Sequence, residues 1–194
     1  MNKTVKLIVQ LTLVVVILIL VYFVYESIMK PVRFNKEKSY REEIVKERLI
    51  DIRNAEIQYR NIYDVYTGSF DTLIDFVMNE ELPLIKLLAD PDDTTFTKHI
   101  KDTIGFVTIQ DTLYKDREGF DPIQLRFIPF SDGQEFELAV DTMRRGGVLV
   151  NVIEVVAPKE AYLKGMNEKM IEQMTKMYMK FGSMTDPSTD GNWE

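Results

Sequence analysis

The sequence predicts an α+β protein in which an N-terminal transmembrane helix continues into an amphipathic helix packed on a three- to four-stranded antiparallel sheet, plus a C-terminal helix. Three observations support this fold class. A long uncharged run lies near the N-terminus, helical periodicity follows it, and alternating segments separated by turn residues occupy the second half. A helix and a sheet that are each apolar on one face can bury those faces against each other.

The apolar run covers residues 7–25, starts at Leu7, ends at Tyr25 and contains no charged residue. About 20 such residues at 1.5 Å each span the hydrocarbon core of a bilayer. Tyr22 and Tyr25 lie near one end, where amphipathic rings favour the interface. A cleaved signal peptide would have a shorter apolar region and an A-x-A-like site, which residues 26–31 lack. We therefore expect an uncleaved single-pass anchor.

The positive charges around the anchor leave its orientation open. Two lysines precede the anchor, and more basic residues follow it, which favours a cytoplasmic C-terminal domain on the positive-inside rule. Acidic residues are mixed among them, however, and long domains translocate largely regardless of charge.

Helical periodicity begins at Asn35, after Pro31, where we expect a kink or short break because proline lacks a backbone donor. Apolar residues then recur at spacings of three and four, which is typical of one buried helix face. This stripe consists of Val45, Leu49, Ile52, Ala55, Tyr59, Ile62 and Tyr66.

Gly68 is the expected C′ residue of this helix, because glycine adopts the left-handed conformation without a Cβ penalty. Ser69 can cap a second helix, with Asp71 in its first turn. The apolar face of that helix is expected to comprise Leu73, Ile74, Phe76 and Val77.

Several later segments have the composition of strands. We expect strands over residues 106–114, 125–130, 135–140 and 148–156. The second and third flank Asp132-Gly133, which is hairpin turn chemistry, so they should pair. The last is almost wholly apolar, which predicts a central position in the sheet.

The connections between these strands carry turn-forming residues. Pro83 and Pro91 indicate a connection over residues 82–93, and residues 144–147, Arg-Arg-Gly-Gly, form a second turn.

A final helix is expected after Pro158, with a stripe of Met166, Met170, Met174, Met177 and Phe181. Methionine thioethers can bind Cu(I), but no His or Cys accompanies these, and methionine also fills apolar faces. Packing is the preferred interpretation, and the candidate partner surface comprises Met170, Met174 and Met177.

Composition argues against several functions. The chain has 194 residues, no Cys, one His (His99) and a net charge of −7. Cysteine chemistry and a multi-His metal site are therefore excluded within one chain. An acidic chain without a basic stripe is not expected to bind nucleic acid. P-loop, G-x-S-x-G and G-x-G-x-x-G motifs are absent, so we expect no enzyme activity, no cofactor and no metal.

Calcium is the alternative ligand that the sequence leaves open. Asp186, Ser188, Asp190 and Gly191 match the opening of an EF-hand loop, but Glu194 occupies the ninth position rather than the twelfth. A second acidic cluster comprises Asp90, Asp92 and Asp93, for which a solvated loop is the preferred interpretation.

The order of these elements resembles type IV pilins and type II secretion pseudopilins. The helix end carries an Ala–x–x–x–Tyr run, followed by glycine and a leucine-bearing segment. These positions are Ala55, Tyr59, Tyr66, Gly68, Phe70 and Leu73. Residues 1–15 contain no Gly and no acid, so the resemblance does not extend to a prepilin-peptidase site. It implies anchoring in the bacterial inner membrane, with the C-terminal domain in the periplasm.

We therefore expect a non-enzymatic structural or assembly component of a bacterial envelope machine, with protein partners for which a second copy of the chain is one candidate. The alternative is a membrane-tethered ligand-binding or sensor module with calcium as candidate ligand. The expected parts are a short tail at 1–6, the transmembrane helix at 7–25, a connector at 26–40, a pilin-like α+β domain at 41–182 and a flexible tail at 183–194.

Overall fold

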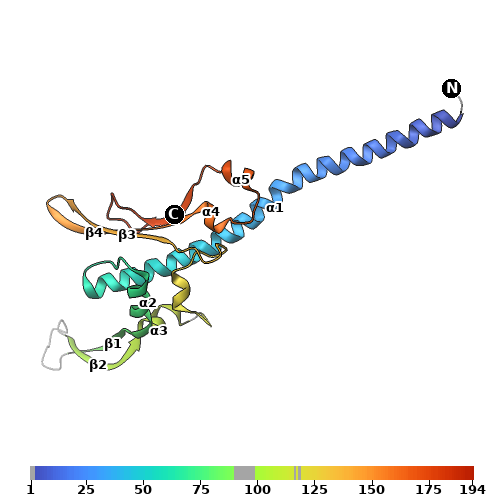
Figure 1. Cartoon of the computed structure of the whole chain (residues 1–194). Helices are drawn as coiled ribbons and strands as arrows, with labels where there is room; N and C mark the ends of the chain where they lie inside the picture. Colours follow the sequence, from blue (N-terminus) through green and yellow to red (C-terminus); the bar gives the residue numbers. More distant parts are fainter. Residues whose placement is uncertain (1–2, 90–98, 116, 118) are drawn as a thin grey trace.

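The computed structural model describes residues 3–89, 99–115, 117 and 119–194, and it has an α+β architecture. Helix α1 (Lys3–Tyr63) is much longer than any other described element. Its N-terminal half projects alone, whereas the rest of the chain surrounds its C-terminal half (Figure 1). This division follows from the sequence, because the projecting half is apolar on all sides and the enclosed half is apolar on one side.

Helix α1 is continuous through Pro31, so the break expected there is absent. Proline removes one hydrogen bond from a helix, and here the helix continues on both sides of it. The helix ends at Tyr63, and Asp64 adopts a left-handed conformation with φ of 61° while its N–H bonds to the carbonyl of Arg60. The prediction that Gly68 fills this C′ role was wrong.

The apolar stripe of α1 forms one side of the core. Val45, Leu49, Ile52 and Ala55 are completely buried, as the periodicity predicts. The stripe weakens towards the helix end, where Tyr59 is half-buried and Ile62 is exposed. Tyr66 is buried, but it lies beyond the helix.

Helix α2 (Phe70–Asn79) follows α1 after a short turn. Its predicted face is confirmed, since Leu73, Phe76 and Val77 are buried and Ile74 packs against the core. Ser69 occupies the N-cap position, but its side chain makes no capping hydrogen bond.

The described strands form two antiparallel sheets, of which one has three strands, as expected, and the other is an additional pair. Within the described residues, strands β1 (Glu81–Ala89) and β2 (His99–Thr108) pair with each other and with no other strand. The second sheet has the order β3-β4-β5, formed by β3 (Glu137–Arg145), β4 (Val148–Pro158) and β5 (Tyr178–Gly182). The central position predicted for the apolar strand is confirmed as β4. Gly146 and Gly147, both with positive φ, form the predicted turn between β3 and β4.

Two predicted boundaries before this sheet were wrong. Most of the connection expected over residues 82–93 belongs to β1, although residues 90–98 lie outside the described part of the chain. The strand expected over residues 106–114 stops at Thr108, whose side-chain oxygen accepts a hydrogen bond from the N–H of Asp111 and caps α3 (Ile109–Tyr114). This capping explains why a helix replaces the second half of that strand.

The expected hairpin over residues 125–140 is reduced to a turn. Residues 125–130 form no strand; the short 3₁₀ helix η1 (Pro122–Leu125) ends there and only an isolated bridge joins Phe127 to Glu135. The N–H of Ile128 bonds to the carbonyl of Gln134 at 2.8 Å, which closes the loop around Asp132-Gly133.

The single C-terminal helix is replaced by α4 (Lys159–Tyr162), α5 (Glu168–Glu172) and β5. Gly165 has a φ of 79°, which interrupts the helix, and Asn167 caps α5. Phe181 belongs to β5, where strand pairing with β4 satisfies the backbone. The segment expected to be a flexible tail lies beside β5, because the N–H of Gly182 bonds to Asp190 and the N–H of Asn192 bonds to Lys180.

Candidate functional site

The N-terminal half of α1 is an exposed apolar surface. Every side chain from residue 5 to residue 25 is exposed, and nearly all of them are hydrophobic. Within the described part of the chain, α1 is the one helix that is long and apolar enough to cross a membrane by length and composition. Thr12 satisfies its hydroxyl within the helix by donating to the carbonyl of Ile8. This surface needs an apolar environment, which lipid or another protein can supply.

The structure does not gather the three methionines of the candidate partner surface on one helix. Met170 lies in α5, Met174 follows α5, and Met177 precedes β5. Met166, Met170 and Met174 are half-buried against the core, whereas Met177 is 55% exposed. The methionines therefore divide between packing and exposure.

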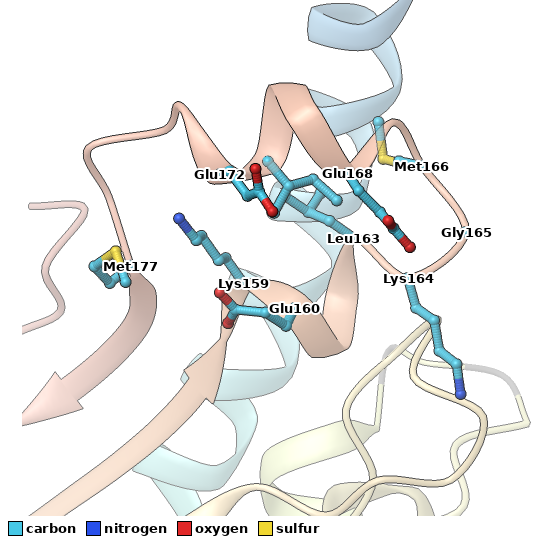
Figure 2. A pocket seen from close by; sticks show the side chains of 10 residues that line it. Lys159, Glu160, Leu163, Lys164, Gly165, Met166, Glu168, Glu172 and Met177 are labelled. Carbon is cyan, nitrogen blue, oxygen red and sulfur yellow. The ribbon is translucent and has the colours of Figure 1, made fainter.

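A pocket of about 500 Å³ lies between α4, α5 and the segment before β5 (Figure 2). Its lining combines lysines, glutamates and apolar side chains, a mixture that can hold a ligand by ion pairing and by burial. The lining residues are Lys159, Glu160, Leu163, Lys164, Gly165, Met166, Glu168, Ile171, Glu172 and Met177.

Lys159 is the unusual member of this pocket because its residue is only 3% exposed. Its Nζ donates to the backbone carbonyl of Met174 at 3.3 Å. In Figure 2 the amino end of Lys159 points into the space between Met177 and Glu172. Buried lysines usually have a partner. No sequence motif singled out this lysine, which is the first residue of α4.

Glu56 is a second buried charged residue, on the α1 side of the turn that leads to α2. Its Oε2 accepts a hydrogen bond from the backbone N–H of Thr67 at 3.0 Å. Burial raises the pKa of Glu56 to about 8, and the hydrogen bond from Thr67 offsets this only in part. Among the described residues, its Oε1 has no hydrogen-bond partner. The helical periodicity of the sequence did not identify Glu56 as a buried residue.

Asp51 links α1 to the segment after α3. Its carboxylate pairs with Arg117, and its backbone carbonyl accepts a hydrogen bond from the hydroxyl of Tyr114 at 2.9 Å. Burial raises the pKa of Asp51 despite the attraction of Arg117 and Arg48, and burial also raises the pKa of Tyr114. These contacts cross more than 60 positions of sequence, so no local pattern predicts them.

The acidic residues of the EF-hand-like segment make contacts within the protein. Asp186 pairs with Arg145, and Ser188 donates to Asp190. Glu194 pairs with Arg53 at 2.7 Å, and this hydrogen bond lowers the pKa of Glu194. In the described ranges, no group of three or more His, Cys, Asp or Glu side chains is placed to hold a metal ion.

Two further candidates fall at or near the undescribed segment. Asp90, Asp92 and Asp93 lie outside the described residues, and His99 is the first residue of β2.

Comparison with protein-family models, with curated proteins and with solved structures found no match. The fold and the exposed helix thus define the class: an α+β protein with a long apolar N-terminal helix, a small antiparallel sheet and further short helices.

Proposed function

We propose that this protein is a single-pass, membrane-anchored structural or assembly component of a bacterial envelope machine, and that it acts through non-covalent contacts. The observation that carries the proposal is the continuity of α1. One uninterrupted helix has an all-round apolar half outside the domain and a second half whose apolar stripe forms one side of the core of the domain. At 1.5 Å per residue it measures about 90 Å.

This continuity supports a mechanical role for the anchor. A flexible linker would let the domain rotate freely above the membrane, whereas a helix transmits position and orientation. Buried side chains such as Val45 and Leu49 hold the domain to the same helix. Lateral contacts made by the apolar half would therefore set the arrangement of the domains, which suits an assembly component better than a freely moving receptor.

The resemblance to pilins and pseudopilins supports the finer parts of the proposal. It implies that the apolar half lies in the bacterial inner membrane and the C-terminal domain in the periplasm. The partners would be other proteins of the assembly, including a second copy of this chain. The proposal invokes no cofactor and no catalysis.

The test of this proposal combines topology with lateral contacts in cells. A reporter that is active only in the periplasm, fused after Glu194, should be active, and the chain should resist alkaline extraction from membranes. Because the chain contains no cysteine, single-cysteine variants report contacts cleanly. Tyr40→Cys on the exposed side of α1 should form a discrete cross-linked product under oxidation, whereas Leu149→Cys at the β3–β4 turn should not.

Two results would contradict the proposal. A chain that alkaline extraction releases is not anchored by α1. A reporter that is active only in the cytoplasm removes the periplasmic placement and, with it, the pilin-like role.

A second candidate function is a membrane-tethered ligand-binding or sensor module, and the pocket containing Lys159 favours it. The calcium version of this candidate predicts that millimolar calcium raises the melting temperature of the full chain in detergent. Glu194 would first have to leave Arg53, so Arg53→Gln should increase the shift. An unchanged melting temperature in both proteins removes calcium as the ligand.

A further inference from the structure

A second, smaller pocket lies where α1 leaves its exposed apolar half. It has a volume of about 280 Å³. Lys30, Arg33 and Phe34 contribute from α1, and Met166, Asn167 and Met170 contribute from the segment that contains α5. This is where the C-terminal part of the chain comes closest to the apolar half of the helix, as the position of α5 beside α1 in Figure 1 shows.

The continuity of α1 sets the depth of this pocket relative to a membrane. If the apolar run ends at Tyr25, Lys30 lies about 8 Å and Arg33 about 12 Å further along the helix axis. The headgroup region of a bilayer is roughly 5–8 Å thick on each side. Lysine and arginine side chains can extend along a helix to place their charges at that level. The backbone of the pocket therefore lies at the outer edge of the headgroup region, and the side chains of Lys30 and Arg33 can extend back to reach the headgroups.

The charges of the pocket suit a phosphate. Lys30 and Arg33 have exposed side chains, and both lie near the single carboxylate of Glu26, at 3.9 Å and 3.7 Å. Two cations share one anion, so the group retains a net positive charge. Exposed ion pairs of this kind are weak and exchange readily, and both side chains bind phosphate oxygens well.

The other side of the pocket is apolar. Met166 and Met170 are half-buried, flexible and apolar. Such side chains can contact the lipid molecules whose phosphates the neighbouring cations bind.

We propose that the segment carrying α5 rests on the membrane surface and that Lys30 and Arg33, with Asn167 beside them, take the phosphate of an anionic phospholipid headgroup while Met166 and Met170 contact the lipid. This inference rests on the proposed membrane anchoring. Its consequence is that the domain is held to the membrane at two points, α1 and α5, which fixes its tilt. The half-buried methionines then serve lipid contact as well as core packing.

The experiment uses the full chain in phosphatidylcholine vesicles, with and without phosphatidylglycerol. Trp193→Phe removes the one native tryptophan, and Met170→Trp places a fluorophore at the pocket. Met78→Trp is the matched control, because Met78 is an exposed methionine on α2, beside the far end of α1. A quencher attached to the lipid headgroup should quench Met170→Trp several-fold more strongly than Met78→Trp. If Met170→Trp alters the circular dichroism spectrum, Met166→Trp replaces it.

The role of the two positive charges is tested with the double variant Lys30→Gln and Arg33→Gln. Phosphatidylglycerol should increase the quenching of the tryptophan in Met170→Trp. This increase should disappear when Lys30→Gln and Arg33→Gln are added. It should persist when Lys46→Gln is added instead, because Lys46 is an α1 lysine far from the pocket. Equal quenching at positions 170 and 78 in a chain that remains in the vesicles overturns the contact while leaving the anchoring intact. If phosphatidylglycerol still increases the quenching in the double variant, Lys30 and Arg33 do not form a phosphate site. Release of the chain from the vesicles by alkaline extraction would instead contradict the proposed function.

Discussion

The carboxylate of Glu56 on α1 and the backbone N–H of Thr67 are joined by a hydrogen bond of 3.0 Å between Oε2 and N. Thr67 in turn bonds through its hydroxyl to the carbonyl of Ser69, and the N–H of Ser69 donates to that hydroxyl. The turn between α1 and α2 is thus organised by one buried acid and one threonine. The sequence suggested a turn at Gly68-Ser69, and the tertiary structure supplies the groups that hold it.

Replacing Glu56 should change how stability depends on pH. Burial raises the pKa of Glu56 from 4.5 to about 8 in the folded protein, so the folded state binds this proton more tightly than the unfolded state. Its contribution to the free energy of unfolding is therefore fully present below about pH 4.5 and is lost as pH rises towards 8, by on the order of 3–5 kcal/mol. Glu56→Gln keeps an acceptor for Thr67 and should flatten this part of the profile.

The measurement is the melting temperature of the full chain in detergent between pH 5 and about pH 8. Glu43→Gln is the control, since Glu43 has an exposed side chain on the same helix, and its profile should match the parent. Identical slopes for Glu56→Gln and the parent protein would show that Glu56 does not titrate in this range.

Gly182 should be irreplaceable for steric reasons. Its φ is 76°, and a Cβ there would lie 2.1 Å from the backbone carbonyl oxygen of Ile153 on the paired strand. Gly182→Ala should lower the free energy of unfolding by more than about 2 kcal/mol. Gly146→Ala has a φ of 59° but open space around it, so it should cost only about 1 kcal/mol of backbone strain. Denaturant titration compares the two, and equal losses would mean that the β4–β5 contact relaxes easily.

Arg117 should stabilise the fold by compensating a buried charge. The Asp51 side chain is 5% exposed and the Arg117 side chain is 45% exposed, so solvent screens the pair in part. Arg117→Gln should cost about 1–3 kcal/mol, because the buried carboxylate loses its partner. Asp51→Asn combined with Arg117→Gln should cost less than the sum of the single changes. Strict additivity in this double-mutant cycle would show that the pair contributes no coupling.

Replacing Met174 and Met177 by glutamine should affect the stability of the protein to different extents. The Met174 side chain packs against the core, so Met174→Gln should lower the free energy of unfolding by about 1–2 kcal/mol. Met177 is exposed, so Met177→Gln should leave the melting temperature unchanged. Any loss of partner binding in this variant would then report a contact made by Met177. A comparable loss in both variants would assign Met177 to the core as well.

Several elements were predictable because their signals are local and long. The apolar run needs no tertiary context, and four stripe residues of α1 are buried as their spacing indicates. The consecutive glycines at 146 and 147 and the apolar strand β4 were also readable. In each case the pattern either spans many residues or requires a positive φ, so that other secondary structures are excluded.

The short C-terminal elements were not predictable in this way. Methionines at spacings of three and four are consistent with one helix, but β4 has a free edge whose hydrogen bonds residues 178–182 satisfy. Met166, Met170 and Met174 then pack from short helices and turns. A segment of a few residues has too little intrinsic preference to resist such pairing.

The sequence alone was enough to predict the long apolar helix, the amphipathic half of α1 and the α+β class, because hydrophobic periodicity over many residues fixes which surface must leave water. Only the tertiary structure decided that the helix runs unbroken through Pro31, that Glu56 and Lys159 are buried, and that Arg117 reaches Asp51. These features depend on groups brought together from distant positions, where desolvation and hydrogen bonding act between neighbours in space.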